Sequence, residues 1–288
     1  MSSDKIITNS PKDVFSEIQS RLKKLEEKRK SKIIFSIGGY SISMMMSLHY
    51  HRIIRKIGET DVLELVLDSG GGQIDSAAKI VNIFREYCKT FNVIVPFFAK
   101  SAATYIAVSA DNLILCKAGE LGPVDPQVKH PALDTFFPAS SIKDALEFIE
   151  STKDPYIKLT MADKLDPFLI GAYQAAMRES RQYLEETPHI KSAENKKEIV
   201  FALTDKYIDH GYPINKPICK ELKLKNCGDD ILENEIENEI YDIHDMLVNE
   251  IAENNYDLIV ISSKDKVLIG GPKKVVDMPK DLQTTFPK

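Results

Sequence analysis

The sequence predicts an α/β fold in which βα units repeat around a largely parallel sheet. Short apolar runs rich in β-branched residues alternate with segments that repeat apolar residues at helical spacing, most regularly between residues 62 and 116. Strands and helices that alternate in this way form βαβ crossovers, which make neighbouring strands parallel. The chain has 288 residues, of which 43% are hydrophobic, so it can supply one large core.

The first predicted elements are a helix and a strand. Ser10, Pro11 and Asp13 are typical of a helix start, and apolar residues then recur along one narrow stripe to about residue 30. The other faces of this helix are charged, so we expect either a surface helix packed along its stripe or an arm that bridges subunits. The run KIIFSIG at 32–38 predicts the first core strand.

The middle of the chain is predicted to alternate, with strands at 62–67, 91–98 and 112–116 and helices at 74–88 and 102–110. It then becomes mainly helical, near 139–151, 164–186 and 194–209. The remainder is an acidic segment, expected to be helical, and a hairpin across SSKD. We therefore expect an N-terminal helical arm (1–31), a main domain (32–226) and a C-terminal extension (227–288).

Two strand-to-helix connections carry the residues typical of a catalytic site. The first, DSGGGQID, places three glycines directly before a helix, where backbone N–H groups can approach a developing negative charge without interference from a Cβ atom. The second places Ser101 directly before the small-residue helix AATYIAVSA, beside the free N–H group of Ala102. Together they predict an oxyanion hole that faces a serine nucleophile, although each connection alone also suits an ordinary tight turn or an N-cap.

These motifs, together with LGPVDPQ at 121–127, resemble the serine dehydrogenase proteinase family, whose relatives include signal peptide peptidase A and the Clp protease subunits. The resemblance extends from about residue 33 to about residue 224. It implies a ClpP/crotonase-like fold for the main domain and a serine endopeptidase activity through an acyl-enzyme at Ser101. By the same resemblance, the oxyanion donors would be the backbone N–H groups of Gly71 or Gly72, with Gly72 preferred, and of Ala102.

The general base is not fixed by the resemblance. Clp-type enzymes use a histidine after the serine, but the matching stretch here offers Asp125 and Gln127 instead. Signal peptide peptidase relatives use a lysine farther along, for which Lys143 is the candidate, provided that burial lowers its pKa. His210 is the alternative, because it lies in DHGYPI, which resembles the HDYPI element of the family with Gly211 in place of the acid.

Composition restricts the partners. The net charge of −5 and the absence of a basic face argue against nucleic acid, and no apolar stretch is long enough for a membrane span or a secretion signal. The four cysteines lack CxxC spacing, which favours free thiols in a reducing cytoplasm. We expect no cofactor and no metal, because no histidine or cysteine cluster has ligand spacing.

Three functions remain open from the sequence. The first is a cytoplasmic serine peptidase that acts on peptides or proteins as a homo-oligomer, as the resemblance implies. The second is a crotonase-type acyl-CoA enzyme, which would use similar backbone N–H pairs for a thioester enolate. The third is an oligomeric scaffold that keeps the fold without a competent base.

Overall fold

The centre of the protein is a six-stranded sheet with strand order β11-β10-β1-β2-β3-β5. The computed structural model describes residues 14–39, 41–129, 136–224, 227 and 232–270. Four strands run parallel in chain order: β1 (Lys32–Gly38), β2 (Thr60–Asp68), β3 (Cys88–Val95) and β5 (Asn112–Leu115). The predicted α/β fold with a largely parallel sheet is therefore confirmed.

The C-terminal hairpin belongs to the same sheet. Strands β10 (Tyr256–Ser262) and β11 (Lys266–Gly270) pair antiparallel across the predicted SSKD turn, and β10 pairs antiparallel with β1. The division of the chain at residues 31 and 226 stays a prediction. The hairpin beyond residue 226 nevertheless completes one edge of the central sheet.

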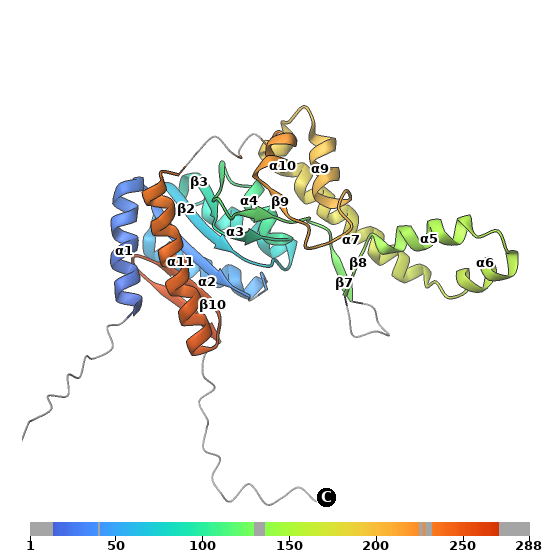
Figure 1. Cartoon of the computed structure of the whole chain (residues 1–288), viewed down its shortest axis with the longest axis horizontal. Coiled ribbons are helices and arrows are strands. Elements are labelled where there is room, and N and C mark those ends of the chain that lie inside the picture. Colours follow the sequence, from blue (N-terminus) through green and yellow to red (C-terminus); the bar gives the residue numbers. More distant parts are fainter. Residues whose placement is uncertain (1–13, 40, 130–135, 225–226, 228–231, 271–288) are drawn as a thin grey trace, which may run out of the picture.

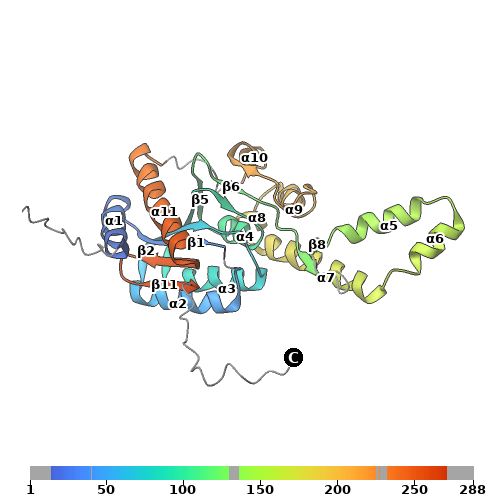
Figure 2. The same ribbon diagram turned by 60° about the horizontal axis from the view of Figure 1, so that its bottom comes forward.

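Helices cover both faces of this sheet (Figures 1 and 2). Helices α1 (Val14–Arg29) and α11 (Asn234–Asn254) lie on one face, and α2 (Met44–Ile57) and α3 (Ile74–Arg85) lie on the other. Strand residues alternate between the two apolar cores, because successive side chains of a strand point to opposite faces. The apolar stripe of α1 is buried in the core shared with α11, so α1 packs along its stripe, the first of the two alternatives above.

A small second sheet continues from the end of β3. It has the order β4 (Phe98–Ala99), β6 (Glu120–Leu121) and β9 (Ile214–Asn215), and helix α4 (Ala102–Val108) follows β4. This sheet brings together segments around residues 100, 122 and 211, which are far apart in the sequence. A hairpin of β7 (Gln127–Lys129) and β8 (Phe136–Pro138) follows β6.

The remaining helices form a projecting unit and a compact cap. Helices α5 (Ser141–Ser151) and α6 (Pro155–Ala162), with the start of α7 (Pro167–Glu186), project away from the sheet (Figures 1 and 2). Asp154 and Asp166 cap α6 and α7 through side-chain bonds to backbone N–H groups, each with proline at the helix start. The cap consists of α8 (Pro188–Lys191), α9 (Lys196–Thr204) and α10 (Lys216–Glu221). Among all the helices described, none is long and apolar enough to cross a bilayer.

Candidate active site

Ser101 lies on a strained turn between β4 and α4. Its backbone has φ 53° and ψ −123°, a conformation that residues other than glycine seldom adopt. Such strain costs about 1–3 kcal/mol and persists only where the surroundings enforce it. Here the N–H of Ser101 donates to the carbonyl of Pro123 at 3.1 Å, and the helix that starts at Ala102 fixes the other side. The turn presents the hydroxyl away from the core.

The glycine turn packs directly against this serine. Gly71 has φ 100°, and a Cβ atom on it would lie 2.7 Å from the Cβ of Ser101. Gly72 has φ 152°, and a Cβ atom there would lie 2.3 Å from the carbonyl oxygen of Ile42. Both positions therefore require glycine, for the backbone conformation and for the close approach.

Among the described residues, the backbone N–H groups of Gly72 and Ala102 have no acceptor. The N–H of Gly71 instead donates to the hydroxyl of Ser69 at 3.2 Å. Because Gly71 is already bonded, Gly72 is the better candidate for binding an oxyanion.

A histidine and an aspartate face the serine across the same cleft. The Nδ1 atom of His210 lies 2.6 Å from Oδ1 of Asp125, and the side chains are 31% and 3% exposed. The second oxygen of Asp125 accepts from the amide of Gln127 at 2.9 Å. A buried carboxylate at Nδ1 favours the tautomer with the proton on that nitrogen, which leaves the Nε2 lone pair free to accept a proton.

The loop that carries His210 is held on both sides. The rings of Tyr207 and Tyr212 stack at 4.0 Å between centroids, which closes the loop at its base. The ammonium group of Lys100 donates to the carbonyl of Gly211 at 3.2 Å and to Glu120 at 2.6 Å. Lys100 directly precedes Ser101, so this side chain ties the histidine loop to the turn that bears Ser101.

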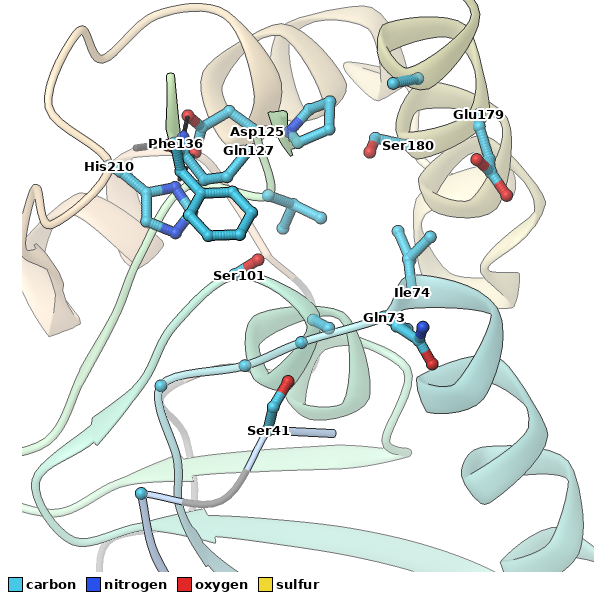
Figure 3. Close-up of a pocket in the computed structure, with 18 residues that line it drawn as sticks. Ser41, Gln73, Ile74, Ser101, Asp125, Gln127, Phe136, Glu179, Ser180 and His210 are labelled. Atoms are coloured by element: carbon cyan, nitrogen blue, oxygen red, sulfur yellow. Dashed lines mark hydrogen bonds and ion pairs between the residues drawn. The ribbon is translucent and has the colours of Figure 1, made fainter. Parts of the chain in front are cut away.

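Ser101, Ala102, the glycine turn, Asp125 and His210 line one cleft of about 680 Å³ (Figure 3). The Ser101 hydroxyl points toward the imidazole of His210 and the ring of Phe136, and Ser180 and Glu179 of α7 form the opposite wall. Within the described part of the chain, the Ser101 hydroxyl makes no hydrogen bond. Catalytic hydrogen bonds are often long in unliganded enzymes and shorten when substrate binds.

Lys143 lies outside the cleft that contains Ser101. It is on α5, with a side chain that is 76% exposed and 3.6 Å from the carboxylate of Glu147 one turn along the helix. It lines a separate pocket beside Met177 and Arg181, not the cleft of Ser101. The burial that would make a lysine a base at neutral pH is therefore missing in this structure.

Of the predicted site residues, the structure brings Ser101, Gly71, Gly72, Ala102 and His210 together in one cleft. The sequence reasoning missed the role of Asp125 as partner of His210. The signal was present, because LGPVDPQ carries an acid where Clp-type enzymes have histidine. What the sequence lacked was evidence that residues 125 and 210 meet.

Three of the four cysteines are poor candidates for a competing nucleophile. Burial raises the pKa of the Cys116 thiol to about 12 and that of Cys88 to about 11, so neither is a thiolate at neutral pH. Cys219 also has a raised pKa, chiefly through its hydrogen bond with Cys227 and then through burial. None of the four cysteines is in a disulfide, and in the described ranges no three residues of metal-binding type come together.

A hydroxyl on a strained turn, a paired histidine and aspartate, and unpaired backbone N–H groups in one cleft are the kinds of group that a serine hydrolase uses. The family model of the ClpP-like SDH-type serine proteinases matches residues 11–266. The chain belongs to this family, which confirms the resemblance found in the sequence.

Two relatives from Methanocaldococcus jannaschii are similar in sequence. Uncharacterized protein MJ0137 is 29% identical over 216 residues, which cover 70% of this chain and 71% of the relative. Uncharacterized protein MJ1495 is 28% identical over 175 residues, or 60% of this chain and 55% of the relative.

Solved structures of ClpP1 from Listeria monocytogenes are also similar. The first covers 74% of this chain and 95% of its own, at 13% identity and a TM-score of 0.45. A mutant of the same protein has a TM-score of 0.39 at 13% identity, and the match covers 74% of this chain and 99% of the mutant.

Proposed function

We propose that this protein is a serine endopeptidase in which Ser101 is the nucleophile, His210 the general base and Asp125 the group that orients the base. The observation that carries the proposal is the 2.6 Å pair of His210 and Asp125 in the same cleft as Ser101. Membership of a serine proteinase family supports the reaction class.

The proposed reaction follows from the roles of these groups. The hydroxyl of Ser101 attacks the peptide carbonyl carbon while Nε2 of His210 takes its proton. The carbonyl oxygen becomes an oxyanion that accepts hydrogen bonds from the N–H groups of Gly72 and Ala102, and loss of one such donor typically costs 10²–10³-fold in kcat. His210 then protonates the leaving amine, and water hydrolyses the acyl-enzyme by the same route.

Asp125 acts without changing its own protonation state. It accepts the Nδ1–H of His210 and stabilises the imidazolium that forms when His210 takes a proton. The hydrogen bond from Gln127 satisfies the other carboxylate oxygen, so the carboxylate is fixed in orientation. Lys143 is the weaker candidate because it is exposed and outside the cleft.

The two alternative functions are less well supported. The scaffold hypothesis depended on the lack of a competent base, and a histidine already bonded to a buried aspartate supplies one. A crotonase-type enzyme requires no hydroxyl nucleophile, whereas Ser101 is held in a strained conformation that points its hydroxyl into the cleft.

We also propose that the protein forms a homo-oligomer through the projecting helices. Within α5 and α6, which the structure describes completely, no residue is buried. Large apolar side chains nevertheless occur along the projection: Phe148, Tyr156, Leu159 and Phe168, the last 91% exposed. Large apolar side chains that stay exposed on neighbouring helices favour a protein interface. The free thiols suit our proposal of a cytoplasmic location.

Labelling with a fluorophosphonate probe tests the proposed function. The probe reacts preferentially with an activated serine, so we expect modification of the peptide that contains Ser101 and no modification of that peptide in a Ser101→Ala variant. Ser180→Ala is the matched control, because this serine lines the same cleft without a base. Labelling at another serine, or no labelling of folded protein, would contradict the proposal.

A further inference from the structure

A second histidine–aspartate pair lies behind the glycine turn, outside the cleft. Nε2 of His244 lies 2.7 Å from Oδ2 of Asp68, and the side chains are 6% and 10% exposed. His244 comes from α11 and Asp68 is the last residue of β2, so the pair links segments 176 positions apart. Neither residue lines the Ser101 cleft.

Stability alone explains this pair poorly. Oδ1 of Asp68 and Nδ1 of His244 are both buried without a hydrogen-bond partner among the described residues. The exposed carboxylate of Asp245 lies 3.6 Å from Nδ1, beyond hydrogen-bond distance. A buried pair that leaves polar atoms unsatisfied stabilises a fold less than apolar side chains of the same volume would.

The position of the pair points to the two turns of the active site. Asp68 directly precedes Ser69, whose hydroxyl accepts the N–H of Gly71 and whose backbone bonds to Phe98 and Lys100. The pair also contacts the segment that leads to Ser101, because the His244 ring packs against Phe97 with centroids 4.8 Å apart. Phe97 directly precedes β4, which leads to Ser101.

We infer that His244 is a positioning residue. It holds the glycine turn through Asp68 and the segment before Ser101 through Phe97. It thereby fixes the distance between the oxyanion donors and Ser101. This inference rests on the proposed function. It gives the C-terminal segment a part in acyl transfer, although no residue of α11 lines the cleft.

The rate of fluorophosphonate labelling at Ser101 tests the inference, measured together with the thermal unfolding midpoint of each variant. We expect His244→Ala to slow labelling about 10- to 100-fold, because a displaced donor loses part of its stabilisation of the transition state. His244→Gln keeps an N–H donor close to the Nε2 position and should recover most of the rate. In peptide hydrolysis the loss should fall on kcat and leave KM unchanged.

Two further variants separate positioning from stability. Tyr241→Phe is the matched control, because it removes a hydrogen bond of α11 to the N–H of Ala118, away from the glycine turn, and keeps the ring against Phe97. It should lower the unfolding midpoint without slowing labelling. The double variant Asp68→Leu with His244→Phe replaces the pair by apolar side chains, so it should fold and still label slowly.

The possible results distinguish failure of the positioning role from failure of the proposed function. If the folded double variant labels at the wild-type rate, or if Tyr241→Phe slows labelling as much as His244→Ala, the inference is wrong. If His244→Ala does not fold, the double variant and His244→Gln decide. If the wild-type protein is not labelled at Ser101, the proposed function fails, and the inference fails with it.

Discussion

The cleft and the projecting helices are built from the same chain in opposite ways. Around the cleft, the groups that hold Ser101 and His210 are hydrogen-bonded within the chain: Asp125, which bonds His210, is 3% exposed, and the Ser101 N–H is bonded to Pro123. In α5 and α6, by contrast, no residue is buried and aromatic side chains face outward. The comparison teaches that, within the described residues, the cleft is held by contacts inside one chain, whereas large apolar side chains of the projection stay exposed.

The largest loss of activity is expected from a substitution of Asp125 in the cleft. Replacement by asparagine removes the carboxylate that fixes the tautomer of His210, so we expect the rate of peptide hydrolysis to fall about 10⁴-fold. Steady-state kinetics of peptide hydrolysis measure this loss. Asp205→Asn is the control, because Asp205 pairs with Arg181 outside the cleft and should leave kcat nearly unchanged. Equal losses in both variants would contradict the role given to Asp125.

A smaller effect is expected at the glycine turn. Gly72→Ala places a Cβ atom 2.3 Å from the Ile42 carbonyl oxygen at a φ of 152°, so the turn must move and carry its N–H group with it. We expect kcat to fall about 10²–10³-fold, the effect of losing one oxyanion donor. Gly171→Ala, in open space on α7, controls for the exchange itself. Wild-type kcat in folded Gly72→Ala would exclude Gly72 as a donor.

Substitutions on the projecting helices should change the stability of the single chain little, but should clearly weaken its association with other copies. Phe148→Ser combined with Leu159→Ser removes apolar surface that is already exposed, so the unfolding free energy should change by less than about 0.5 kcal/mol. Association should weaken at least about tenfold if these side chains are interface anchors. Light scattering over a dilution series measures the mass. An unchanged mass, or a wild-type protein that is already monomeric, would contradict the proposed interface.

Much of the fold could be predicted from the sequence because its signals are local. Residues 32–38 form β1 as predicted, and the glycine turn and Ser101 lie on strand-to-helix connections. The short helix α6 was missed, because its apolar residues have no buried face that would give a periodic pattern.

The parts of the site that could not be predicted depend on long-range contacts. Asp125 and His210 are 85 positions apart, and no local pattern encodes that they meet. The same holds for β10, which joins the sheet beside β1 at the far end of the chain. Lys143 has the right residue type for a base, but its helix projects from the core, and only the tertiary structure reveals its exposure.

The most direct test of the central claim compares two bases in one experiment. The rate of fluorophosphonate labelling at Ser101 is measured for His210→Ala and for Lys143→Ala beside the wild-type protein. Because His210 lies in the cleft and Lys143 outside it, we expect His210→Ala to lose labelling and Lys143→Ala to keep the wild-type rate within about twofold. Loss of labelling in Lys143→Ala, with labelling retained in His210→Ala, would contradict the account.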